Sequence, residues 1–132
     1  MKFTIRILMF ILLAANLPAQ EITVPKAASS PIIDGKFNEP CWQSIPWQEQ
    51  FHLLNQNNAK EKDMAFKATH DANCLYLAFR CKEVGMDKLK AGITAHDGRV
   101  WDDDSLEIFI DAANDKNAYF HLIVNRLGTV FD

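Results

Sequence analysis

The sequence predicts an all-β fold: an antiparallel β-sandwich of the jelly-roll or immunoglobulin-like type with one or two short helices. Several short segments alternate apolar and polar side chains, as half-buried strands do. Turn-forming residues, such as Asp71-Ala72-Asn73 and Gly128, separate these segments at close spacing. Helical periodicity covers only short windows, so sheets must bury most of the apolar side chains.

The N-terminal segment, residues 1–20, is predicted to be a secretory signal peptide. Lys2 and Arg6 supply its positive end, and the apolar run Ile7–Ala15 is shorter than the ~20 residues that a membrane span needs. The alternative is an N-terminal anchor that is not cleaved. We expect a secreted or periplasmic protein whose residues 21–132 form one domain.

Charge limits the partners of that domain. The net charge of −3 becomes −5 without residues 1–20, because they carry two positive charges and no negative ones. An acidic domain has little attraction for nucleic acid, and nothing predicts a membrane role beyond export. Neutral sugars and calcium remain compatible partners.

The first half of the domain begins with extended segments and a short helix. Residues 21–24 are predicted to be extended, and residues 31–35 a brief strand that ends in an Asp34-Gly35 turn. Asn38 is expected to cap a helix that Pro46 ends, with Glu39 and Pro40 in its first turn. Its buried side chains would be Cys41, Trp42 and Ile45.

Two alternating segments follow a polar region that holds a weak strand at residues 51–54. Residues 64–69 and 75–80 are predicted strands, and Asp71-Ala72-Asn73 joins them as a hairpin turn. A further short helix is expected around Met86–Lys90.

The second half contains strands at residues 106–111 and 120–125, a turn at Gly128 and the start of another strand. The pattern stops at Asp132 without a tail or linker. We therefore expect the front portion of a longer protein and a sandwich that is incomplete at its C-terminal side.

The three cysteines, Cys41, Cys74 and Cys81, leave the disulfide state open. Cys74 and Cys81 flank one strand and would lie roughly 20 Å apart, too far for a disulfide. Cys41 could pair with either, or all three could be small buried apolar side chains.

The segment Trp101-Asp102-Asp103-Asp104 immediately precedes a strand. An indole among charges lies more readily at a rim than in a core, and its flat face can stack on the C–H surface of a sugar. Asp102, Asp103 and Asp104 are candidate ligands for a structural calcium ion, which takes six to eight oxygens. Their spacing is not that of an EF-hand, and the alternative is a solvated acidic turn.

Strand alternation brings three polar side chains to one face of the sheet. Glu107 opposes Leu106 and Ile108, while His121 and Asn125 oppose the apolar side chains of their own strand. A carboxylate and an amide on one face can hold neighbouring sugar hydroxyls. The alternative is an ordinary solvated face of an antiparallel sheet.

The order of these features resembles the family 9 carbohydrate-binding modules and their sandwich relatives. The residues that carry the resemblance run from about Ile32 to the end of the chain. They are Ile33-Asp34-Gly35, Glu39-Pro40-Cys41-Trp42, Asp71 with Leu75-Tyr76-Leu77-Ala78, Trp101-Asp102-Asp103-Asp104-Ser105-Leu106-Glu107-Ile108-Phe109-Ile110-Asp111, and Val124-Asn125 with Gly128.

The resemblance implies a calcium-containing β-sandwich that grips the ends of glycan chains between two Trp rings and is often appended to a secreted polysaccharide-degrading enzyme. Trp101 matches one ring, Glu107 a hydroxyl-binding carboxylate and Asn125 a neighbouring amide. Two features depart from the pattern. Ile123 stands where sugar-binding members have an Arg, and the second Trp would fall beyond Asp132.

The sequence therefore predicts a secreted, non-catalytic module for poly- or oligosaccharide, linked to polysaccharide catabolism, with a catalytic domain downstream. Its predicted carbohydrate-binding residues are Trp101, Glu107, His121 and Asn125. One alternative is a glycoside hydrolase, which needs two suitably spaced carboxylates, although no hydrolase motif occurs. The other is a cytochrome-like haem-binding sandwich, which would use Met64 or Met86 with His70 or His121.

Overall fold

A computed structural model of the protein describes residues 22–49, 51–52, 60–61 and 63–132. Within these ranges antiparallel strands dominate and one short α-helix occurs, which confirms the predicted fold class and is consistent with a β-sandwich. The predicted signal peptide and residues 53–54 of the weak strand lie outside the described residues. No helix in the described part is long and apolar enough to cross a membrane.

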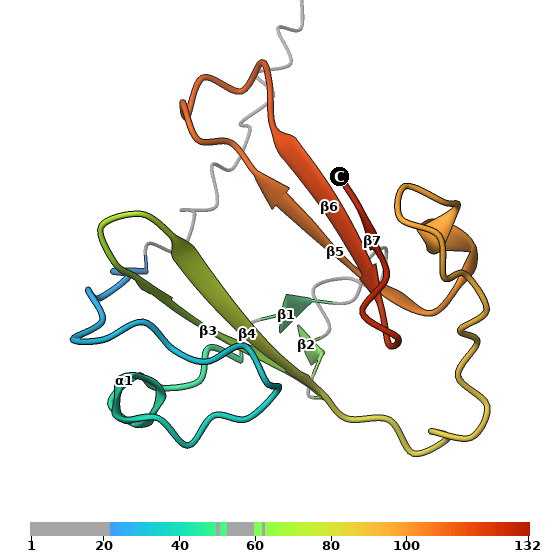
Figure 1. Ribbon diagram of the computed structural model, residues 1–132, viewed down its shortest axis with the longest axis horizontal. Coiled ribbons are helices and arrows are strands. Elements are labelled where there is room, and N and C mark those ends of the chain that lie inside the picture. The colour runs from blue at the N-terminus through green and yellow to red at the C-terminus, as the bar shows by residue number, and fades with distance from the viewer. Residues whose placement is uncertain (1–21, 50, 53–59, 62) are drawn as a thin grey trace, which may run out of the picture. The chain divides into compact units, whose positions relative to one another are not determined.

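The chain divides into two compact units, residues 1–80 and 81–132, and each is described by itself. In the first unit β3 pairs with β4, and the short strands β1 and β2 form a separate antiparallel pair (Figure 1). Its elements are α1 (Pro40–Gln43), β1 (Phe51–His52), β2 (Lys60–Glu61), β3 (Met64–His70) and β4 (Leu75–Cys81).

The helix α1 covers one face of β3 and β4. Trp42 and Ile45 pack with Ala78 of β4 in a small apolar core, as expected of the buried side of this helix. The predicted cap is wrong by one residue: Glu39 occupies the N-cap position, because Pro40 takes the first helical position. The carbonyl of Asn38 instead accepts a hydrogen bond from the Gln43 side chain.

The buried face of β3 contains a lysine that hydropathy alone does not place there. Lys67 is 7% exposed, and its ammonium donates to the Trp42 carbonyl at 2.7 Å. Burial, followed by the charge of Arg80, lowers the pKa of Lys67. Both cations lie over the Trp47 ring, at 4.7 Å for Lys67 and 4.5 Å for Arg80, so the aromatic face partly compensates for lost hydration.

The predicted hairpin turn between β3 and β4 is confirmed, and Asp71 holds it. Its Oδ1 accepts from the backbone N–H groups of Asn73 and Cys74 at 2.7 and 2.9 Å. Its Oδ2 accepts from the hydroxyls of Ser30 and Tyr76, both at 2.6 Å. These donors, that of Ser30 first, hold the pKa of Asp71 well below its usual range.

Two predicted elements are wrong. Residues 31–33 form no strand, and Ile33 is 81% exposed, because this stretch pairs with no other strand. The Asp34-Gly35 turn that follows is nevertheless present, with Gly35 at a φ of 77°. Residues 84–88 form a turn and residues 89–90 no regular structure, so the predicted helix is absent; the Lys90 N–H donates to the Asp104 carboxylate at 2.6 Å instead of continuing a helical ladder.

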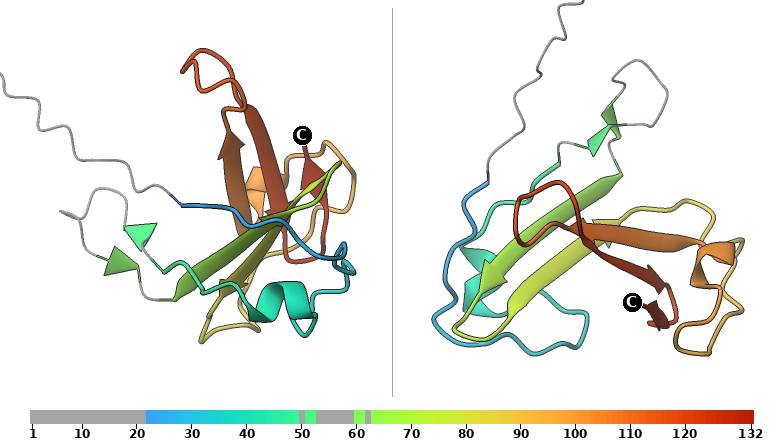
Figure 2. Two further views of the ribbon diagram at one scale, coloured as in Figure 1. Left: turned by 90° about the vertical axis from the view of Figure 1, so that its left-hand side faces the viewer. Right: turned by 90° about the horizontal axis from the view of Figure 1, so that it is seen from above.

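The second unit is built on a three-stranded antiparallel sheet in the order β5-β6-β7, which Figure 2 shows from two further sides. The predicted strands and the turn at Gly128, which has a φ of 79°, are confirmed. Its elements are the 3₁₀ helix η1 (Val100–Asp102), β5 (Ser105–Ile110), β6 (Phe120–Asn125) and β7 (Val130–Phe131). All three cysteines of the chain are free.

Candidate functional site

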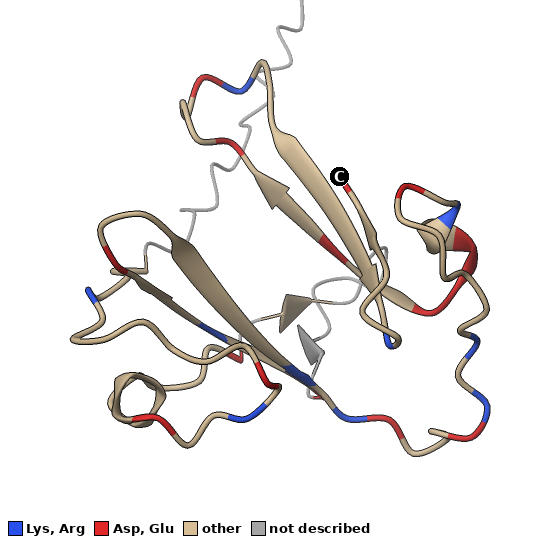
Figure 3. Ribbon diagram, viewed as in Figure 1, with Lys and Arg blue, Asp and Glu red and all other residues tan. Residues whose placement is uncertain are grey.

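The register of β5 and β6 determines which side chains share the candidate binding face. Ser105 pairs with Asn125, Glu107 with Ile123 and Phe109 with His121. Directly paired residues of an antiparallel sheet point to the same side, so Glu107, His121 and Asn125 share one face. The observed register therefore confirms the expectation from strand alternation that these three side chains share one face. Within β5 and β6, Glu107 is the one residue with an acidic side chain and no Lys or Arg occurs; Figure 3 shows an acidic position within β5 and none along β6.

Glu107 and His121 form a hydrogen-bonded pair on this face. The His121 Nε2 lies 2.9 Å from a Glu107 carboxylate oxygen, and an ionised carboxylate only accepts, so Nε2 carries the proton. The side chains are 47% and 30% exposed. Glu107 therefore retains exposed lone pairs with which it can accept further hydrogen bonds.

Trp101 is held in the short helix η1 beside the sheet. The neighbouring Val100 is fully buried and anchors this helix, while Trp101 remains 46% exposed. The Trp101 ring meets the Phe131 ring edge-on, with centroids 5.1 Å apart. Phe131 pairs with Ile123, which itself pairs with Glu107, so Trp101 lies beside the row of side chains that contains Glu107. The indole thus combines a fixed position with a solvent-accessible surface.

Asn125 is placed differently from the other three predicted sugar-binding residues. It is 4% exposed, and its amide nitrogen donates to the Ile93 carbonyl and to Asp103 at 2.8 and 3.0 Å. Its amide oxygen accepts from the backbone N–H groups of Leu127 and Thr129, both at 3.0 Å. An amide offers two donors and two acceptor lone pairs, and all four are used within the chain. These four bonds give Asn125 a structural role at the end of β6, on the same face as Glu107 and His121.

Asp103 fixes the loop on which Trp101 lies. It is 8% exposed and accepts hydrogen bonds from the backbone of Gly92 at 3.0 Å and of Ile93 at 2.9 Å, besides the one from Asn125. The Ile93 amide makes the largest contribution to holding the pKa of Asp103 below its usual value, while partial burial opposes the effect. These hydrogen-bond donors stabilise the negative charge of the Asp103 carboxylate without a metal ion.

The three predicted calcium ligands, Asp102, Asp103 and Asp104, bind different donors within the chain. Asp102 pairs with Arg99 at 3.0 Å, and Asp104 accepts from the Lys90 backbone. Calcium binding by these carboxylates stays a prediction. These contacts agree with the alternative of an acidic turn, with Asp103 as its buried anchor.

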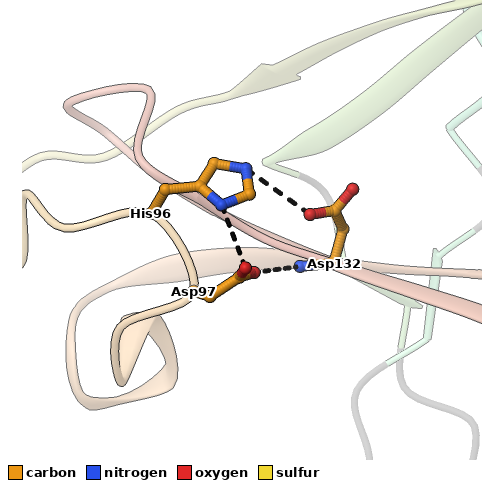
Figure 4. A group of neighbouring side chains, drawn as sticks. All are labelled: His96, Asp97 and Asp132. Atoms are coloured by element: carbon orange, nitrogen blue, oxygen red, sulfur yellow. Dashed lines mark hydrogen bonds and ion pairs between the residues drawn. The ribbon is translucent and has the colours of Figure 1, made fainter.

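A different group can hold a metal ion. Among the described residues, His96, Asp97 and Asp132 place one potential ligand atom each within 4.8 Å of one another (Figure 4). The imidazole lies between the two carboxylates, with Nδ1 3.2 Å from Asp97 and Nε2 3.5 Å from Asp132. All three are exposed. Sequence spacing could not identify this group, because the chain between Asp97 and Asp132 must first form the sheet.

The haem alternative needs one Met with one His, and each unit contains one of each. Met64 and His70 belong to the first unit, and Met86 and His121 belong to the second. Of the histidines, His121 is paired with Glu107, and the His70 Nδ1 lies 2.9 Å from the Asp71 carbonyl. The arrangement in the second unit favours recognition of polar ligands instead.

A partly exposed indole held beside a partly exposed carboxylate is compatible with a carbohydrate-binding β domain. The description of the family whose model matches the chain is "Carbohydrate family 9 binding domain-like", and the match covers residues 33–127. The chain belongs to this family, as the resemblance predicted. No curated protein and no solved structure matches the chain.

Proposed function

We propose that this chain is an exported, non-catalytic module that binds poly- or oligosaccharide and serves a polysaccharide-degrading protein. The family membership implies carbohydrate binding. The observation that carries the site is the position of Trp101, whose ring is 46% exposed yet fixed against Phe131 beside the row that contains Glu107. Residues 1–20 provide the export signal in this proposal.

In the proposed mechanism, the Trp101 ring stacks on the C–H face of a sugar, and the Glu107 carboxylate accepts hydrogen bonds from its hydroxyls. His121 orients Glu107 through the 2.9 Å hydrogen bond. Asn125 and Asp103 contribute indirectly, because they hold the loop that carries Trp101.

The Trp101→Ala variant tests this function. We expect its affinity for the polysaccharide that the wild-type chain binds to fall about 10-fold, because an aromatic contact contributes on the order of 1 kcal/mol beyond its burial. Isothermal titration calorimetry after a polysaccharide screen provides the measurement. Trp101→Phe is the matched control and should retain most of the affinity. Unchanged binding in a folded Trp101→Ala variant would exclude Trp101 from the site.

Besides the predicted calcium ligands Asp102, Asp103 and Asp104, the residues His96, Asp97 and Asp132 form a second candidate metal site. One imidazole and two carboxylates suit zinc better than calcium, which takes oxygen ligands. We expect zinc to raise the melting temperature of metal-free protein more than an equal concentration of calcium, and His96→Ala to abolish the zinc effect. A calcium effect that is equal in size and survives His96→Ala would contradict this assignment.

A further inference from the structure

Two segments of the second unit, which carry the Trp101 and Phe131 rings, meet at Asp97. Asp97 lies in the loop that leads to Trp101, and Asp132 directly follows Phe131. The Asp97 N–H donates to the Val130 carbonyl at 3.0 Å, and the Asp132 N–H donates to the Asp97 carboxylate at 3.3 Å. A ligand that strengthens this junction therefore also holds together the segments that carry the two rings.

His96 brings an imidazole between the two carboxylates of this junction, as Figure 4 shows. Its Nδ1 lies 3.2 Å from Asp97, and its Nε2 lies 3.5 Å from Asp132. Among the residues that the structure describes, no Lys or Arg side chain forms an ion pair with either carboxylate. Carboxylates that lie close together favour a cation between them, and either a metal ion or protonation of the imidazole can supply the positive charge.

The ligand atoms of these three side chains lie within reach of one zinc ion. Each residue offers one atom, and the three atoms lie within 4.8 Å of one another. Ligands at about 2.1 Å from a tetrahedral zinc ion lie about 3.4 Å apart, so a short movement of the exposed side chains would bring them together. Water would take the fourth position, as it does in zinc sites with three protein ligands.

The strand β7 is short, so an added ligand would stabilise its position. It has two residues, and its register with β6 consists of two residue pairs. Elements with few pairing bonds open locally at a low free energy, and opening of β7 would separate Asp132 from Asp97. A ligand that binds only the closed form lowers the open population, by about 100-fold at 100 times its Kd.

We propose that a zinc ion bound by His96, Asp97 and Asp132 fixes β7 to the loop before η1 and thereby regulates the contact between the Trp101 and Phe131 rings. The effect on the rings, whose centroids lie 5.1 Å apart, requires no saccharide. Its consequence for saccharide affinity rests on the proposed function: a ligand that needs the fixed Trp101 ring binds more tightly with zinc, and by linkage it raises the affinity for zinc by the same factor.

Nuclear magnetic resonance of the ¹⁵N-labelled full chain tests this regulation, with zinc chloride as the only added ligand. The Asp97 N–H reports the junction directly, because it donates to the Val130 carbonyl. We expect zinc at 100 times its Kd to slow hydrogen exchange of this N–H about 100-fold. The indole N–H signal of Trp101, assigned with Trp101→Phe, should shift, whereas that of Trp42, which is buried in the first unit, should not.

Two variants remove ligands of the zinc ion. His96→Ala and Asp132→Asn should abolish both the slowed exchange and the shift of the Trp101 signal. Asparagine keeps the size of the side chain, and the backbone N–H that donates to Asp97 is unchanged. His52→Ala is the matched control and should respond to zinc as the wild type does, because His52 is an exposed histidine of the first unit.

The outcomes separate this inference from the proposed function, since none of them involves a saccharide. Slowed exchange of the Asp97 N–H with an unchanged Trp101 signal would leave the zinc site in place and overturn the regulation. Absence of zinc binding in calorimetry would assign the positive charge to the protonated imidazole and overturn both. Zinc-dependent dimers in sedimentation analysis, with exchange of the Asp97 N–H unchanged, would place the ion between two copies of the chain and also overturn the regulation.

Discussion

Replacing Asn125 with alanine is expected to lower the free energy of unfolding by about 3 kcal/mol, the largest stability effect among the changes considered. The buried amide makes four hydrogen bonds within the second unit, to Asp103, to the Ile93 carbonyl and to two backbone N–H groups of the Gly128 turn. Alanine would leave buried donors and acceptors without partners. Each such group costs roughly 1–3 kcal/mol, although relaxation of the loop recovers part of this.

Thermal denaturation followed by circular dichroism measures this effect, and a loss of about 3 kcal/mol corresponds to a fall in melting temperature of roughly 10 °C or more. Asn117→Ala is the matched control, because Asn117 is exposed and its observed bond is made by its backbone N–H. A variant of Asn125 that keeps the wild-type melting temperature but loses sugar binding would contradict the structural role and support the direct hydroxyl contact that the sequence predicted.

The same network predicts a loss of stability in acid. The folded protein holds the pKa of Asp103 below the value of about 3.9 that an unfolded aspartate has. The stabilisation is therefore complete above that unfolded pKa and is lost as the pH falls through the lower pKa of the folded state. Asn125→Ala removes one of the donors that lower this pKa, so its unfolding free energy should depend less steeply on acid pH than that of the wild type.

Local patterns in the sequence predicted the second unit well. Strict alternation in residues 105–110 and 120–125 places Glu107 and His121 on one face, and the observed register agrees with it. Gly128 adopts the positive φ that the predicted turn needs. These features depend on neighbours along the chain or on one adjacent strand, and such interactions leave a periodic signal.

Features that depend on distant partners were not predictable in the same way. The sequence predicted that Asp103 binds a cation, but the loop at residues 92–93 folds back and supplies backbone donors to it. His96 and Asp132 lie 36 residues apart and come together only in the folded unit. Ile33 has a strand-like neighbourhood but no strand to pair with, so local propensity did not decide its conformation.

Replacing Glu107 with glutamine is expected to weaken carbohydrate binding about 10- to 100-fold, the largest effect on affinity. A charged acceptor contributes roughly 1.5–3 kcal/mol to a hydrogen bond with a hydroxyl, and glutamine keeps the size of the side chain while removing the charge. The change also weakens the bond from His121, so the imidazole that stacks on Phe109 loses its orienting partner. Calorimetry with the saccharide that the wild-type chain binds in the polysaccharide screen measures the effect.

Glu49→Gln provides the matched control, because Glu49 is also an exposed carboxylate that pairs with a side-chain nitrogen, that of Arg80 at 3.2 Å, but it belongs to the first unit. Its affinity should equal that of the wild type. The melting temperature of Glu107→Gln should stay within a few degrees of the wild-type value, since exposed ion pairs contribute little to stability. A folded Glu107→Gln variant with wild-type affinity would show that the carboxylate accepts no hydroxyl, whereas a variant that binds sugar but loses turnover on polysaccharide would favour the hydrolase alternative.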